Sequence, residues 1–303
     1  MRPVQRIGAA VAAIVVLAGL AGGVWWFGIR ITPARMAAML PPSEAPVLYV
    51  DFAALRAAGV LDALAGSAGV EEPEYKKFVE ATSFDYRKDL DAALLAFRPG
   101  DTLLVVKGSF EAGRLAAYAR SNGGRCAGEL CSVQGSAPER QVSWIPSRRG
   151  GLLLMAVSPD PMAAALLSAN AVEPDFTPPP AAMWLHLPGS QLRGGAALPP
   201  GLSALLSSLE GAQRALLSAG VAKDGFEVVL DAPCADNGKA TEIAARLTRT
   251  TDMVVKLLAR EGKKPDPSDF SGLLAGGVFE ARGAAVRGRW PLSRAFLPAI
   301  APR

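Results

Sequence analysis

The sequence predicts an α+β protein: an N-terminal transmembrane helix followed by two similar halves with largely antiparallel sheets. Three observations predict it. An uncharged apolar stretch occupies residues 7–29. Short apolar runs bounded by Gly and Pro alternate with Ala-rich helical patterns in the remainder of the chain. A similar order of elements, strand, helix, hairpin, helix, hairpin and helix, occurs on both sides of a Pro-rich break at residues 171–181.

The apolar stretch is long enough to cross a bilayer. As a helix it would span about 34 Å, against a hydrocarbon core of about 30 Å. Trp25, Trp26 and Phe27 stand at its end, where aromatic rings favour the headgroup level. The alternative is a cleaved signal peptide with Gly19-Leu20-Ala21 as the cleavage site.

We expect a single-pass protein of the bacterial inner membrane, with a cytoplasmic N-terminus and most of the chain in the periplasm. The lipid bilayer would then be a partner through residues 7–29. Small residues at positions 18, 19, 22 and 23 would also allow two such helices to approach closely, so self-association is a second expectation.

Domain boundaries follow from composition. The expected divisions are an anchor at 1–29, a linker at 30–45, a first half at 46–170, the Pro-rich linker at 171–181 and a second half at 182–303. The length of 303 residues agrees with about two domains of ordinary size. With 50% hydrophobic residues and little net charge, the chain is not disordered as a whole.

The first half begins with an apolar strand and ends with a Pro-initiated helix. The expected elements are a strand at 45–52, helices at 53–66 and 73–82, a hairpin at 90–110, a helix at 111–124, a hairpin at 141–158 and a helix at 159–170. The Pro99-Gly100 pair marks the first hairpin turn.

The second half repeats this order with a longer central helix. The expected elements are a strand at 183–189, a helix at 201–209, a hairpin at 210–233, a long helix at 235–262, a short helix at 270–277, a hairpin at 277–290 and a final helix at 291–300. Ile243, Leu247 and Val254 form part of the apolar face of the long helix.

The charge distribution argues against nucleic acid as a partner. The chain has 32 basic and 28 acidic residues, and the excess of four is accounted for by Arg2, Arg6, Arg30 and Arg35 beside the apolar stretch. Residues 44–303 therefore carry no net charge, and no basic field attracts a polyanion.

Cys126 and Cys131 are close enough in sequence to form a disulfide across a tight loop or hairpin. Such a bond is expected in an oxidising compartment, which agrees with export. Two separate buried thiols are the alternative. Cys234 is expected to be a buried or unreactive thiol, with pairing to another molecule as the alternative.

Recognisable catalytic motifs are absent from the sequence. His186 is the only histidine, so no HExxH motif exists, and no GxSxG motif occurs. Alternation in the strand at 183–189 places His186 with Trp184 on one face, either as a structural residue or as a general base. We predict no cofactor, no metal site and no catalytic residue.

One cluster of acidic and aromatic residues lies within 71–91. Its acidic residues are interleaved with basic ones, so a packed, solvated connector is the first interpretation, a partner-binding surface the second, and a catalytic or calcium site the third. Asp89 and Asp91 would share a strand face. The candidate contact patch consists of Tyr75, Phe78, Phe84, Tyr86, Asp89 and Asp91.

The run PVLYVDFAALRAAGVLDAL at 46–64, followed by EYKKFVEATSFDYRKDLD at 74–91 and a strand pair, resembles a group of uncharacterised exported bacterial proteins. These share one N-terminal membrane span and a duplicated α+β ectodomain. The resemblance extends over residues 1–160 and implies architecture, with no functional residues.

The function predicted first is a non-catalytic binding or scaffolding ectodomain with a partner protein in the cell envelope. An enzyme is the alternative, such as a hydrolase using carboxylates near 85–91 with or without His186. A carrier or sensor of a small apolar ligand, held in a cavity between the halves, is a further alternative.

Overall fold

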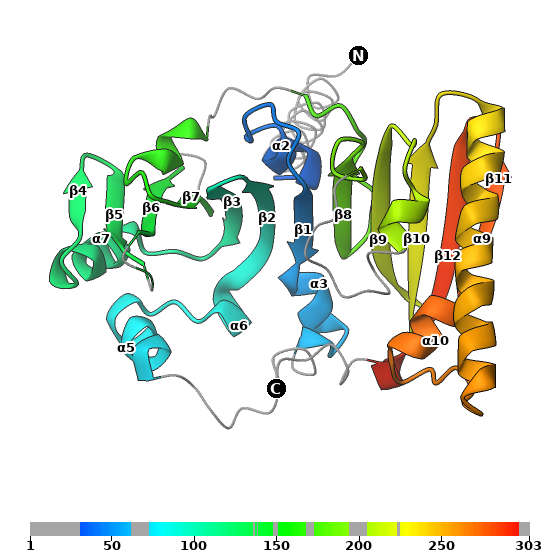
Figure 1. Cartoon of the computed structure of the whole chain (residues 1–303). Coiled ribbons are helices and arrows are strands. Elements are labelled where there is room, and N and C mark those ends of the chain that lie inside the picture. The colour runs from blue at the N-terminus through cyan, green and yellow to red at the C-terminus, as the bar shows by residue number, and fades with distance from the viewer. Residues whose placement is uncertain are drawn as a thin grey trace, which may run out of the picture.

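The computed structural model describes residues 31–61, 73–135, 137, 139–147, 151–167, 173–193, 205–222 and 225–296. These residues form one 12-stranded antiparallel sheet in the order β11-β12-β10-β9-β8-β1-β2-β3-β7-β6-β5-β4 (Figure 1). The strands are β1 Val47–Asp51, β2 Leu90–Arg98, β3 Asp101–Gly108, β4 Arg125–Ala127, β5 Leu130–Gln134, β6 Gln141–Pro146, β7 Leu152–Ser158, β8 Met183–Pro188, β9 Arg214–Ala222, β10 Gly225–Pro233, β11 Val278–Arg282 and β12 Ala285–Ser293.

The sheet has two wings that meet in its middle. The first wing contains β1 to β7 and the second contains β8 to β12. They are joined by the antiparallel pair β1–β8, in which Val47 lies opposite His186 and Tyr49 lies opposite Trp184. We call this pair the seam. In both wings the two strands next to the seam strand follow it in chain order: β2 and β3 after β1, and β9 and β10 after β8. The outer strands then lie in reverse chain order, with β4 and β11 at the two edges.

One face of the sheet, here called face B, is covered by helices in both wings (Figure 1). It carries Leu48 of β1 and Leu185 of β8, because opposed residues in an antiparallel pair share a face. Within the described residues, the α-helices that follow β1 in the chain include α3 Phe52–Ala57, α5 Pro73–Thr82, α6 Tyr86–Asp89, α7 Ala112–Ser121, α9 Asn237–Arg260 and α10 Phe270–Ala275.

In the second wing, the long helix α9 covers face B. Its residues Ile243 and Leu247 are fully buried against Leu230 of β10 and Trp290 of β12. The helix begins at Asp236, whose side chain accepts a hydrogen bond of 2.8 Å from the backbone N–H of Lys239.

In the first wing, α7 covers face B. Leu115 and Ala119 pack with Trp144 of β6 and Leu153 of β7. Near the seam, the short helix α3 places Leu55 in a small core with Val60 and Leu61.

The opposite face, here called face A, carries Tyr49 and Trp184. Near the seam it is covered by the short helix α2 Pro33–Ala37, and further out in the first wing the 3₁₀ turn η1 Ala163–Leu166 covers β6 and β7. Further out in the second wing, face A presents ion pairs such as Arg287–Asp231 and Arg289–Glu227.

The predicted fold class is wrong in its architecture. The molecule is a sheet-rich protein in which the strands of both predicted halves form one continuous sheet, and its helices are few. The cause is the seam: pairing between β1 and β8 joins segments far apart in the chain, and local periodicity carries no information about such pairing. The segment 159–170, predicted as an α-helix, contains the 3₁₀ turn η1. Residues 291–293, predicted as the start of a final helix, extend β12.

The predicted transmembrane helix is likewise not found. No helix in the described part of the chain is long and apolar enough to cross a membrane. The stretch 7–29, on which that prediction depended, lies outside the described residues.

The predicted disulfide is confirmed. Cys126 and Cys131 lie opposite each other in the β4–β5 hairpin at one edge of the sheet, with their Cα atoms 4.0 Å apart. Cys234 is a buried free thiol, as predicted.

Candidate functional site

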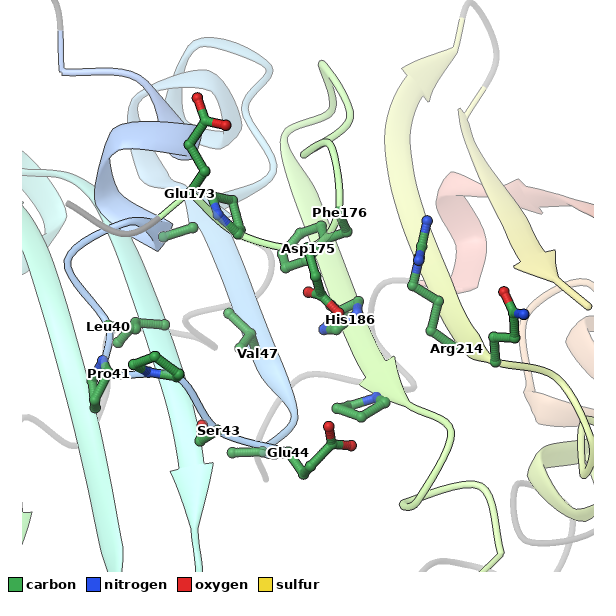
Figure 2. A pocket seen from close by; sticks show the side chains of 16 residues that line it. Leu40, Pro41, Ser43, Glu44, Val47, Glu173, Asp175, Phe176, His186 and Arg214 are labelled. Carbon is green, nitrogen blue, oxygen red and sulfur yellow. The ribbon is translucent and has the colours of Figure 1, made fainter.

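A cavity of about 500 Å³ opens at the seam on face A (Figure 2). Three parts of the chain line it: the stretch 37–47 from the end of α2 to the start of β1, the segment 173–176, and the adjoining ends of β8 and β9. This volume lies within the range typical of small-molecule sites.

Helix α2 positions the first of these parts. Thr32 caps the helix and Pro33 begins it, which favours a helix start at this position. Met36, Ala37 and Met39 are buried against face A, so the chain that follows is held across the seam. The rings of Pro41 and Pro42 restrict the backbone of the loop that forms one wall.

The floor of the cavity is aromatic. The His186 imidazole stacks on the ring of Phe176, with centroids 4.0 Å apart and planes inclined by 9°. Phe176 also contacts Trp184 edge-on, and Trp184 stacks on Tyr49. These rings come from both sides of the seam and from the segment 173–176, so they fix the relative positions of the three parts of the wall.

His186 is the unusual residue of this floor. It is only 4% exposed, yet neither Nδ1 nor Nε2 has a hydrogen-bond partner among the described residues. Leaving a buried polar atom without a partner costs about 1–3 kcal/mol. A buried polar side chain that the protein does not satisfy, and that lines a cavity, is the signature of a group available to a ligand.

The protonation state of His186 follows from its surroundings. Burial lowers the pKa of the imidazole; the nearby Arg214 guanidinium also lowers it, whereas the carboxylates of Asp175 and Glu44 raise it. The net direction is downward from the ordinary value of 6.5. His186 is therefore a neutral imidazole at pH 7, with one hydrogen-bond donor and one acceptor.

Charged side chains stand around the opening. Figure 2 shows the Asp175 carboxylate above the His186 ring, with Glu44 below it and Arg214 to one side. Glu44 is held in place, because its Oε2 accepts a hydrogen bond of 2.9 Å from Ser190 Oγ and its backbone oxygen accepts one of 3.1 Å from Gln191 Nε2. Glu173 adds a third carboxylate.

Among the residues that the structure describes, no group of three or more His, Cys, Asp or Glu side chains is placed to hold a metal ion.

The acidic and aromatic cluster predicted from the sequence lies elsewhere, in and around α5 and α6. Its aromatic rings pack on one another and on α7, in the pairs Tyr75–Tyr86, Phe78–Phe84, Phe78–Tyr118 and Phe84–Phe110. Several of them pack against the buried core of face B. Whether this patch contacts a partner stays a prediction.

The carboxylates of the cluster organise a turn. Tyr75 Oη donates a hydrogen bond of 2.8 Å to Asp85 Oδ1, and the pKa of Tyr75 is raised by burial and by this carboxylate. Asp89 Oδ2 accepts a hydrogen bond from the Asp85 backbone N–H. Asp89 ends α6 while Asp91 stands at an irregularity in β2, so the expectation that they share a strand face is wrong.

The acidic and aromatic cluster does not form a common site with His186. Val47 lies opposite both His186 and Ala96, and Asp91 is five residues from Ala96 along β2. At about 3.3 Å per residue this separates Asp91 from the seam position by roughly 17 Å along the strand. The hydrolase pairing considered from the sequence is not assembled.

Sequence reasoning singled out His186 but missed its neighbours. Glu44, Asp175 and Arg214 come from three segments that only the folded sheet brings together. The available signal was weak: Pro-rich stretches precede both seam strands, at 41–46 and 174–180.

No protein-family model matches the chain, and no curated protein sequence matches it significantly. Solved structures of TP0453 match the chain. Crystal form I is 11% identical, with a TM-score of 0.51, covering 88% of this chain and 96% of that one. Crystal form III is 12% identical, with a TM-score of 0.49, covering 88% of this chain and 96% of that one. The chain thus shares an overall fold with crystal form I of TP0453, over most of the length of both proteins.

Proposed function

We propose that this protein is a non-catalytic binding protein that holds a small ligand in the cavity at the seam. The observation that carries the proposal is the buried imidazole of His186, which lines the cavity and lacks a hydrogen-bond partner. A ligand that supplies this hydrogen bond would remove the cost of leaving the imidazole unpaired.

The composition of the site supports binding of a small molecule. Ligand sites are mostly apolar with a few placed polar groups. Here Leu40, Val47 and Phe176 supply apolar wall, and His186 supplies the polar group at the floor. The disulfide Cys126–Cys131 supports an oxidising compartment as the place where the protein works.

The test uses the fact that the chain has a single histidine. The ring signals of His186 can be assigned without ambiguity in the NMR spectrum of protein labelled at histidine, once any affinity tag is removed. A fragment library is added to this protein. We expect a subset of fragments to shift the His186 signals and to raise the thermal midpoint, because ligands of the native state stabilise it.

A blocked variant provides the control. Ser43 is exposed and lines the cavity, so Ser43→Trp would place a large ring in it. Ser121→Trp makes the same change at an exposed position of α7, outside the cavity lining. We expect Ser43→Trp to abolish the shifts and Ser121→Trp to retain them. If no fragment moves the His186 signals in the unmodified protein, the proposal is wrong.

A further inference from the structure

We infer that the ligand of the seam cavity is a small organic amine that binds as its ammonium ion. This inference rests on the proposed function and adds the chemical class of the ligand. Three features of the cavity carry it: the charge of its lining, the acceptor at its floor and its apolar walls.

The charge of the lining favours a cation. Glu44, Glu173 and Asp175 contribute three carboxylates against the single guanidinium of Arg214, so the described lining carries two net negative charges. His186 adds no positive charge, since burial keeps it neutral. A cation entering this opening meets an attractive potential, and an anion meets a repulsive one.

The floor provides an acceptor for the ammonium group. A neutral imidazole has one nitrogen that accepts a hydrogen bond, and His186 has no donor for it among the described residues. An ammonium N–H can donate to this nitrogen while its charge faces the Asp175 and Glu44 carboxylates on either side of the ring (Figure 2).

The apolar walls favour a ligand in which the ammonium group is attached to an apolar body. Leu40, Pro41, Val47 and Pro188 contribute aliphatic surface to the lining. Methylene groups or an aromatic ring can pack there and displace water from apolar surface. Arg214 stands at one side, where it would disfavour a second cationic centre in the ligand.

The experiment compares three probes with the same phenylalkyl body: 2-phenylethylamine, 2-phenylethanol and 3-phenylpropanoate. Each is titrated into the full-length chain at pH 7.5, and the dissociation constant is read from the His186 ring signals. We expect the amine to bind most tightly and the carboxylate most weakly. Added salt should weaken binding of the amine and leave binding of the alcohol nearly unchanged.

Asp175→Asn and Glu44→Gln test the source of the preference. Both side chains are exposed, so the fold tolerates the changes. Each change should weaken binding of the amine about two- to fivefold, the range for an exposed charge pair, without affecting binding of the alcohol. Glu129→Gln removes one negative charge from the exposed turn between β4 and β5, and it should change none of the three affinities.

The outcomes separate the two proposals. Equal binding of amine and alcohol, or tighter binding of the carboxylate through Arg214, overturns the amine inference and leaves a binding site in place. The same holds if fragments from the library shift His186 while none of the three probes does. If neither the probes nor any fragment shifts His186, the binding function itself fails, and the amine inference fails with it.

Discussion

The imidazole of His186 lies flat against the ring of Phe176, with ring centroids 4.0 Å apart. One face of the imidazole is therefore covered by a hydrocarbon ring, while its two nitrogens lack partners within the described residues. The stack contributes to the burial of the imidazole, and His186 is at the same time a lining residue of the cavity. Replacing His186 should show the effects of its missing hydrogen bonds and of its burial on stability.

His186→Phe should leave the protein as stable as before at pH 7, or more stable by up to about 1 kcal/mol. Removing a buried polar group that has no partner removes its desolvation cost, and a phenyl ring can keep the stack on Phe176. Urea unfolding gives the free energy. A loss of more than about 2 kcal/mol would show that the imidazole makes stabilising contacts in the native state.

Stability should fall below pH 6.5 because of His186. The pKa of the buried imidazole is lower in the folded protein than in the unfolded chain. Protons therefore bind preferentially to the unfolded state, so the contribution is fully present above the unfolded value and is lost as pH falls through about 6.5 toward the folded value.

The measurement compares unfolding free energies at pH 7.5 and 5.5 for the unmodified chain and for His186→Phe. The unmodified chain should lose more stability than the variant over this interval, because only its unfolded state gains the extra proton. Glu44, Asp175 and Arg214 face position 186 and are present in both proteins, so the difference between the two profiles reports the imidazole. If the free energies of unfolding of the two proteins changed in parallel with pH, this pH dependence would not come from His186.

Removing the disulfide should destabilise the sheet edge without disturbing the cavity. Cys126 and Cys131 close a loop of six residues, and a bond across so short a loop is worth about 2 kcal/mol in the chain-entropy treatment. The double variant Cys126→Ser/Cys131→Ser should show this loss in urea unfolding and faster amide exchange in β4 and β5. Its His186 signals should stay where they are. Shifted His186 signals would mean that the edge and the seam are coupled.

Phe78 should matter for stability because of its place in the first wing. Its ring makes edge contacts with Phe84 and Tyr118, and so joins α5 to α7. Phe78→Ala should cost about 2 kcal/mol, less than for a fully buried ring because Phe78 is half-buried. Faster proteolysis within 73–82 would accompany it. Lys77→Ala, at the exposed neighbouring position, should have little effect on either measurement.

Local elements were largely predictable from the sequence. The β2–β3 hairpin follows from two apolar runs around Pro99-Gly100, and Gly100 has the positive φ of 83° that such a turn requires. The long helix α9 follows from its apolar face, and the disulfide from the spacing of two cysteines. Each signal lies within about twenty-five neighbouring residues.

The arrangement of the sheet and the cavity were not predictable in this way. The pairing of Val47 with His186 joins two distant segments, and alternation in each strand is compatible with many partners. The cavity depends on that pairing, since Glu44 and Ser190, which share a hydrogen bond at its rim, are 146 positions apart. A lone histidine in a strand becomes a candidate ligand-binding group only when the neighbours that fail to satisfy it are known.

The seam also has a consequence for the order of assembly. Its strands pair residues that are far apart in the chain, whereas hairpins such as β2–β3 and β9–β10 close over short loops. Because distant contacts carry the larger loop-closure cost, we expect the hairpins to form first and the seam late. The cavity then comes into existence only when both wings are complete. A newly made chain would acquire its capacity to bind at the final step of folding, and occupancy of the cavity would mark a finished molecule.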